Sequence, residues 1–163
     1  MVRCLRVNAM ISWREEMCVG VPAIDDDHKA LFLLVNKLEI CPTWGCAEQT
    51  AKQLYKYTQS HFKREEEIQE YFKFPFIEDQ KNAHRNIINS LSMLIKNDFL
   101  NKNKTTTINE VLSDLILLLR DWLLDHVLTH DIKMRDFLSH TYLMRPACCR
   151  RGASNFLRVE KEH

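Results

Sequence analysis

The run from Ala47 to Phe72 repeats small or apolar residues every three or four positions, as one face of a long α-helix requires. That face carries Ala47, Ala51, Leu54, Thr58, His61, Glu65, Ile68 and Phe72. A histidine and a carboxylate therefore interrupt a stripe that should face an apolar core. A bare buried carboxylate is costly unless it takes a positive partner, and a metal ion would also explain an imidazole one turn away. The stripe thus predicts a helical core that holds a metal site.

Composition favours a single helical domain. The chain has 163 residues, enough for one sizeable core, and only 3 Gly and 4 Pro. Its formal net charge is +1, so neither nucleic acid nor a membrane is expected as a partner. No apolar run approaches the roughly 20 residues of a membrane-spanning helix. Residues 1–10 lack the features of a secretory signal, and we expect a cytoplasmic protein.

The six cysteines show no metal-binding pattern, because the sequence has neither a CxxC pair nor a Cys/His spacing typical of zinc sites. In a cytoplasmic chain these thiols are expected to be reduced and to have no role. The adjacent Cys148 and Cys149 are the one candidate for a redox or metal-capture feature.

Four helices are predicted from apolar periodicity and from helix start and stop signals. Residues 11–24 are expected to form an extended arm, and the aspartates at 25–27 to cap the first helix. Pro42 ends that helix, and Thr107 is expected to cap the last one. The predicted helices cover about residues 25–41, 46–73, 76–99 and 108–138.

Short connections between four helices favour an all-α, up-down-up-down antiparallel bundle. Three parts of the chain are expected: an N-terminal extension over residues 1–10, the bundle over 11–138, and a basic tail over 139–163. The tail lacks an apolar period, so we expect little order there.

Polar residues interrupt the apolar stripes of all four predicted helices, and the bundle should bring them to one end. The interruptions fall early in the first and third helices and late in the second and fourth, at His28, His61, Glu65, Gln80, His84 and His126. In an up-down-up-down bundle these positions share one end. Imidazole and carboxylate together favour iron or another first-row transition metal over calcium or magnesium, and a carboxylate can bridge two ions.

Three motifs resemble those of the hemerythrin family, and in particular of single-domain bacteriohemerythrins. Trp13, Val19-Gly20-Val21-Pro22, Ile24-Asp25 and His28 resemble its W…VGI..ID..H opening, His61-Phe62 with Glu65-Glu66 its HFxxEE element, and Trp122-Leu123, His126 and Asp131 its WL..H….D ending. The resemblance covers about residues 10–138. It implies a non-haem, oxo- or hydroxo-bridged di-iron centre that binds O2 reversibly, with NO as a second candidate ligand.

Carried over by position, the resemblance assigns each site residue a role. His28 and His61 would ligate the iron that binds O2, His84 and His126 the second iron, Glu65 and Asp131 would bridge the two, and Trp122, Leu123 and Leu128 would wall the O2 pocket. No general base is evident beside the site, so an enzyme is not the first expectation.

The chain departs from the family pattern at Gln80. The family has a histidine ligand four residues before the position of His84, and this chain has a glutamine there. An amide coordinates only through its carbonyl oxygen and is a weaker ligand than imidazole, so the second iron is expected to be loosely held, to gain a water, or to be lost. Two alternatives to an O2 carrier follow: a di-iron oxidase or peroxidase-like enzyme, and a bundle whose metal site is partly lost.

Two smaller departures concern the last helix. Periodicity from His126 points to His130, whereas the family resemblance favours Asp131 as the bridging ligand. If Asp131 is the ligand, the helix must bend or loosen between them. Met134 stands where many relatives carry tyrosine, so one hydrogen bond near the site would be missing.

Overall fold

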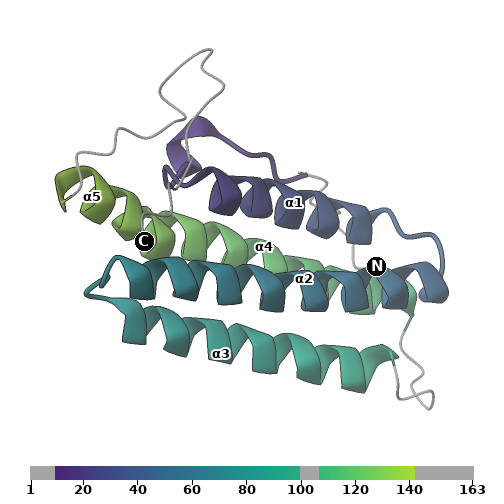
Figure 1. The fold of residues 1–163 in the computed structure, drawn as a ribbon. Coiled ribbons are helices and arrows are strands. Elements are labelled where there is room, and N and C mark those ends of the chain that lie inside the picture. Colours follow the sequence, from purple (N-terminus) through teal and green to yellow (C-terminus); the bar gives the residue numbers. More distant parts are fainter. Residues whose placement is uncertain (1–9, 100–106, 142–163) are drawn as a thin grey trace, which may run out of the picture.

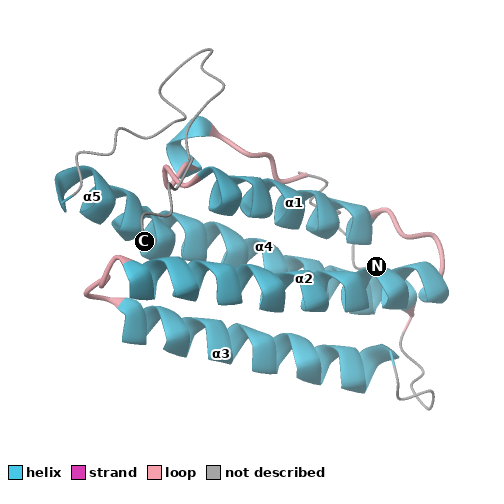
Figure 2. Ribbon diagram, viewed as in Figure 1, coloured by secondary structure: helices cyan, strands magenta, loops and turns pink. Residues whose placement is uncertain are grey.

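The computed structural model describes residues 10–99 and 107–141, and this part of the chain is helical, with no strand (Figures 1 and 2). Its helices are α1 (Pro22–Glu39), α2 (Trp44–Tyr71), α3 (Ile77–Leu94), α4 (Ile108–Asp125) and α5 (Ile132–Thr141). A π-helical segment, His126–Asp131, joins α4 to α5, so these form one long fourth helix. A second π-helical segment, Ile95–Phe99, continues α3.

Neighbouring helices run antiparallel, with the fourth helix behind α1 and α2 (Figure 1). The predicted up-down-up-down bundle is confirmed. The helix boundaries agree with the predicted ones to within a few residues, except at the start of α1. Residues 1–9 and 142–163 lie outside the described part of the chain, and with them nearly all of the predicted extension and tail.

Helix α1 begins at Pro22, so the predicted cap by the aspartates at 25–27 is wrong. Proline suits the first turn because its missing N–H is one of the unpaired donors there and its φ is already helical. Asp25 instead accepts a hydrogen bond from the Val19 N–H at 2.8 Å, which ties the arm to the helix. The arm is also shorter and less extended than predicted, because Glu15–Met17 form a 3-10 turn.

The ends of α2 and α4 follow local rules. The Thr43 side chain caps α2 by accepting from the Cys46 N–H at 3.2 Å. At the other end, Lys73 takes a left-handed φ of 55° and the Phe74 N–H donates to the Gln69 carbonyl at 2.8 Å. The predicted Thr107 cap of α4 is confirmed as a capping box with Glu110.

The core has two apolar clusters. Along each helix, the buried polar residues of the predicted site lie between the residues of one cluster and those of the other. The larger cluster fills the body of the bundle and includes Leu31, Leu54, Leu91 and Leu119. The smaller one closes the end near the α2–α3 turn and consists of Val19, Val21, Ile24, Phe74, Met134 and Leu138.

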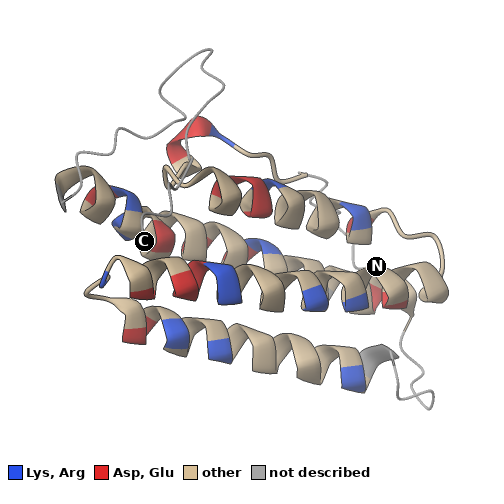
Figure 3. Ribbon diagram, in the orientation of Figure 1, with Lys and Arg blue, Asp and Glu red and all other residues tan. Residues whose placement is uncertain are grey.

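Neither the cysteines nor the surface charges indicate a particular function. Cys41 and Cys46 are free, whereas Cys18 is disulfide-bonded, so the expectation of reduced thiols is wrong at Cys18. Acidic and basic residues are interspersed along the outer faces of the helices (Figure 3). Among the described residues, no helix is long and apolar enough to cross a bilayer.

Candidate metal centre

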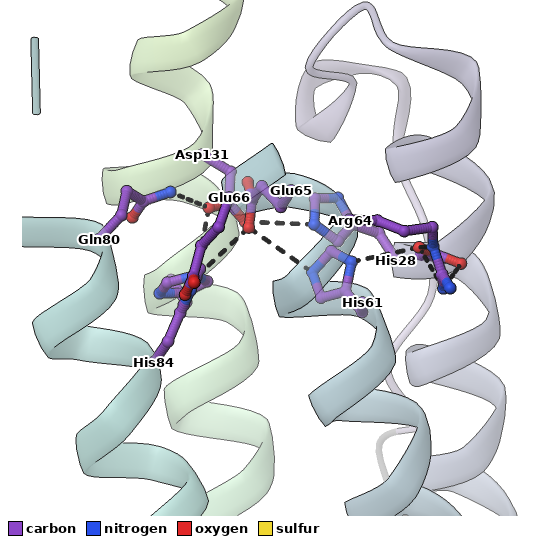
Figure 4. Close-up of polar contacts among 10 residues, drawn as sticks. His28, His61, Arg64, Glu65, Glu66, Gln80, His84 and Asp131 are labelled. Carbon is purple, nitrogen blue, oxygen red and sulfur yellow. Dashed lines mark hydrogen bonds and ion pairs between the residues drawn. The ribbon is translucent and has the colours of Figure 1, made fainter. Parts of the chain in front are cut away.

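All seven residues predicted as metal ligands lie buried at one end of the bundle (Figure 4). None of them is more than 2% exposed, although each has a polar or charged side chain. They come from four helices: His28 from α1, His61 and Glu65 from α2, Gln80 and His84 from α3, and His126 and Asp131 from the fourth helix. The convergence that the sequence predicts is therefore present in the fold.

Four of these residues form a compact group of possible metal ligands. One ligand atom from each of Glu65, His84, His126 and Asp131 lies within 4.8 Å of the other three. The His84 Nε2 atom is 3.3 Å from Glu65 Oε2, and the His126 Nε2 atom is 3.1 Å from Asp131 Oδ1. Two imidazoles and two carboxylates at this spacing suit a first-row transition metal.

The other two histidines contact the same two carboxylates from the α1 and α2 side. The His28 Nε2 atom is 3.2 Å from Asp131 Oδ2, and the His61 Nε2 atom is 3.9 Å from Glu65 Oε2. Each carboxylate therefore stands between two groups of imidazoles, His28 with His61 on one side and His84 with His126 on the other. This is the arrangement that a pair of bridged ions needs.

Several of these buried atoms have no hydrogen-bond partner, and they test whether the residues fit a metal. They are both nitrogens of His28, both oxygens of Glu65, Asp131 Oδ2 and Gln80 Oε1. An orphaned buried polar atom costs about 1–3 kcal/mol, and more when it is charged. Coordination to cations would satisfy the Glu65 and Asp131 oxygens and one nitrogen of His28, so these residues fit a metal centre.

The two carboxylates have opposite pKa directions. Burial raises the pKa of Glu65 well above its usual value, and the nearby Asp131 raises it further. Burial also raises the pKa of Asp131, but His126 and His28 outweigh it and hold that pKa well below the usual value. Two like charges this close do not ionise equally without a counter-charge. A bound cation would let both carry their negative charge.

Two acidic residues hold imidazoles from outside the centre. The His61 Nδ1 atom is 3.4 Å from Asp27 Oδ2, and the His84 Nδ1 atom is 2.7 Å from Glu66 Oε1. When Nδ1 carries the hydrogen and donates to a carboxylate, the Nε2 lone pair is free for a metal. In both histidines it is the Nε2 atom that faces Glu65 (Figure 4).

Asp27 is itself fixed by two donors. Arg64 donates from Nε to Asp27 Oδ2 at 2.8 Å and from an Nη atom to Oδ1 at 2.7 Å. The Tyr57 hydroxyl donates to Oδ1 at 2.7 Å. Although burial raises the pKa of Asp27, its bonds to His61, Tyr57 and Arg64 bring it well below the usual value. Asp27 is therefore a fixed anion beside His61.

Burial lowers the pKa of His61 to about 4, against the opposing effect of Asp27. Burial also lowers the pKa of His84, against the opposing effect of Glu66. Both imidazoles are thus neutral at neutral pH, the form that binds a metal.

Gln80 reaches the centre but faces it with its amide nitrogen. Gln80 Nε2 donates to Asp131 Oδ1 at 2.9 Å, and Gln80 Oε1 is among the orphaned atoms. In this arrangement Gln80 orients a carboxylate through its amide nitrogen, and its carbonyl oxygen is left without a hydrogen-bond partner.

The π-helical segment explains how Asp131 and not His130 faces the centre. A π-turn adds one residue to the helical repeat, so the residue five positions after His126 lies above it. Asp131 is fully buried, whereas His130 is partly exposed and stacks on His126 with ring centroids 5.2 Å apart. The loosening of the helix that was expected between these residues is therefore observed.

The predicted pocket wall is only partly assembled. Leu123 is 1% exposed, whereas Leu128 is 38% exposed and is replaced in the core by Val127. Trp122 stacks on His126 with ring centroids 5.3 Å apart, and so lies beside the imidazole pair His84 and His126 rather than beside His28. Together with His126 and His130, it lines an open groove between α3 and the fourth helix.

For five residues of the site the sequence predicts no role at the metal centre. Asp27, Tyr57, Arg64 and Glu66 gain their roles from pairing across helices, which a single helical stripe does not reveal. Gln69 is different, because it is fully buried one turn after Glu65 on the same face of α2. A polar residue on that stripe was a usable signal, but the apolar neighbour Ile68 was assigned to the stripe instead.

Comparisons with known proteins agree with this geometry. Residues 19–135 match the family model described as the hemerythrin HHE cation binding domain. A bacteriohemerythrin of Stenotrophomonas maltophilia is 24% identical over 122 residues, covering 73% of this chain and 75% of that protein. A myohemerythrin of Theromyzon tessulatum is 25% identical over 123 residues, covering 76% of this chain and 89% of that protein.

A solved structure shares the fold. The crystal structure of a leucine-to-phenylalanine mutant superposes with a TM-score of 0.68 at 23% identity, and the match covers 80% of this chain and 98% of that one. At this level of identity the likeness concerns the fold alone.

Proposed function

The chain belongs to the hemerythrin family, and on that premise we propose that it is a non-haem di-iron protein that binds O2 reversibly for storage, delivery or sensing. The observation that carries the proposal is the set of buried ligand atoms of His28, Glu65 and Asp131, from three helices, that have no hydrogen-bond partner. A cation centre would satisfy the Glu65 and Asp131 oxygens together with one nitrogen of His28. O2 is the proposed ligand, and NO is a second candidate. A cytoplasmic location stays a prediction from the sequence.

The two groups of imidazoles define the two proposed metal positions. The proposed ligands are His28 and His61 on the O2-binding iron, His84 and His126 on the second iron, and Glu65 and Asp131 as bridges. The bridging role is supported by the contacts of each carboxylate with both groups. Asp131, for example, lies 3.2 Å from His28 and 3.1 Å from His126.

Bound in this position, the oxo- or hydroxo-bridged irons would supply reversible O2 binding. The chain's own residues hold the imidazoles in place. Asp27 and Glu66 keep the Nδ1 hydrogens of His61 and His84 pointing outward, so that the Nε2 atoms face inward. Arg64 keeps Asp27 ionised and fixed, so His61 has little freedom to turn.

Apolar packing around the centre excludes bulk water. Phe62 stacks on His84 with ring centroids 3.7 Å apart and an interplanar angle of 6°. Leu123 and Val127 are at most 1% exposed on the fourth helix. Reversible O2 binding requires that a bound iron resist oxidation, and a dry pocket would provide that protection.

A di-iron oxidase or peroxidase-like enzyme is the second candidate, and the Gln80 geometry favours it. Because the Gln80 N–H donates to Asp131, the second iron would have fewer protein ligands and a position open to exchange. An open position on each iron is compatible with turnover. A centre that has lost one iron is the third possibility.

Metal analysis and O2 uptake separate these candidates. An O2 carrier is expected to bind iron, with the second ion held more weakly than the first, and to take up O2 once, without continuing consumption when a reductant is supplied. Steady O2 consumption with a reductant would instead identify an oxidase. Protein that binds no iron when loaded under argon would refute the proposed function.

A further inference from the structure

Gln69 is a fully buried amide for which the bundle offers no partner. It is 0% exposed, and neither its Oε1 nor its Nε2 atom has a hydrogen bond. The flanking residues Ile68 and Phe72 pack against the smaller apolar cluster, so bulk water does not reach this level of the core. A buried amide left unsatisfied costs about 1–3 kcal/mol. Because no hydrogen bond within the fold offsets this free-energy cost, we expect the Gln69 amide to contact a bound ligand.

The helix register places Gln69 opposite Gln80. Glu65 and Glu66 of α2 contact His84 of α3 at 3.3 and 2.7 Å. Because α2 and α3 run antiparallel, one turn from Glu65 toward the connecting turn reaches Gln69, and one turn from His84 in the same direction reaches Gln80.

An ion pair next to the two glutamines confirms this register. Glu70 and Lys81, the residues that follow Gln69 and Gln80, pair at 2.7 Å on the surface. The two buried glutamines thus lie at one level, directly beyond the carboxylates of the metal centre. Between them they present two orphaned amide oxygens, Gln69 Oε1 and Gln80 Oε1.

We propose that Gln69 and Gln80 act together as a clamp for one water on the metal ion beside His84 and His126. A metal-bound water is a strong donor with two hydrogens, and the two orphaned amide oxygens are its acceptors. The Gln80 N–H remains on Asp131, so Gln80 is not itself a ligand. The inference rests on the proposed di-iron centre and names what completes its second metal position.

The test is a comparison of the apo and Fe(II)-loaded forms of wild type and Gln69→Met under argon. Methionine has a similar volume and no amide. In the apo protein it removes an orphaned group, so the Tm is expected to stay the same or rise. In the loaded protein it removes an acceptor of the bound water, so the iron-induced rise in Tm is expected to shrink. The affinity of the second iron is expected to fall about 10- to 100-fold.

Two further variants sharpen the comparison. Thr58→Val is the matched control, because Thr58 is buried on the same helix and its hydroxyl donates only to the Leu54 carbonyl, at 2.9 Å. It should shift the apo and loaded Tm equally. In a Gln80→His background the imidazole takes the place of the water, so Gln69→Met should no longer weaken iron binding. Gln69→Leu serves as a second replacement if the methionine variant does not fold.

The outcomes separate the inference from the proposed function. Equal changes of Tm in the apo and loaded forms of Gln69→Met would make Gln69 a structural residue and overturn the clamp. An undiminished effect in the Gln80→His background would overturn the pairing of the two glutamines. If the wild-type protein shows no iron-induced rise in Tm, the proposed metal centre is refuted, and the proposed clamp is refuted with it.

Discussion

Asp27 shows how much of the site depends on residues that are not themselves proposed metal ligands. It lies on α1, yet it orients His61 on α2, and Arg64 and Tyr57 fix it in turn. Such partners of metal-bound histidines set the imidazole tautomer and strengthen the ligand. The same role falls to Glu66 for His84. Each proposed iron therefore has one imidazole that a carboxylate holds from outside.

Asp27→Asn is predicted to weaken iron binding about 10- to 100-fold, because an amide neither fixes the Nδ1–H tautomer of His61 nor supplies a negative charge. The measurement is an iron titration under argon, with 15N NMR of the apo protein to follow the His61 tautomer. Asp26→Asn is the control, since Asp26 is exposed and pairs only with Lys29 at 2.9 Å. Equal affinities for both variants would show that Asp27 does not position His61.

Gln80→His is predicted to raise the iron content toward two per chain and to slow autoxidation. The imidazole supplies a protein ligand where the glutamine supplies only a hydrogen bond to Asp131. Metal analysis and the rate of oxidation in air check the two effects. If both quantities stay at their wild-type values, the view that position 80 limits the second iron fails.

At the scale of secondary structure, the π-helical segment His126–Asp131 decides which side chain reaches the metal. A regular α-helix would turn His130 toward the centre, and the π-turn brings Asp131 there instead. Helical periodicity alone does not decide between His130 and Asp131. The one extra residue of a π-turn leaves no mark on the apolar pattern of the rest of the helix.

Asp131→Asn is therefore predicted to lose most of its iron, because the variant removes the negative charge of a carboxylate that contacts both imidazole groups. His130→Asn is predicted to keep its iron content, because His130 is partly exposed and only stacks on His126. Metal analysis of the two purified variants checks this. A loss of iron in His130→Asn equal to that in Asp131→Asn would contradict the π-helical geometry.

For the whole molecule, the sequence predicts the four-helix bundle and the convergence of its polar residues, because both depend on helical periodicity and short connections. It mispredicts the start of α1, where three aspartates look like a cap and Pro22 begins the helix. Asp27, Arg64 and Tyr57 escape prediction because their network exists only after α1 packs on α2. Leu128 is exposed because it lies two residues after His126, on the opposite face of the helix, so its closeness in sequence to His126 does not bring it to the pocket.

The stability of the apo protein should reveal the buried neutral state of His61. Its pKa is about 4 in the fold, against a usual value of 6.5, so the unfolded chain takes up the proton first. Stability from this group is complete above about pH 6.5 and is lost as the pH falls toward 4, at about 1.4 kcal/mol per pH unit.

Wild type should accordingly lose stability relative to His61→Gln as the pH falls through that window. Chemical denaturation of both apo proteins at several pH values measures the difference. A difference that stays constant between pH 6.5 and 4 would mean that His61 is protonated in the fold as readily as in the unfolded chain.

Reversible O2 binding at an iron centre is tested most directly by the absorption spectrum of protein loaded with iron under argon and then cycled between air and argon. We predict a visible band that appears in air, disappears when argon removes the O2, and returns over repeated cycles. A band that persists under argon, or the absence of any iron-dependent band, would contradict reversible O2 binding by this protein.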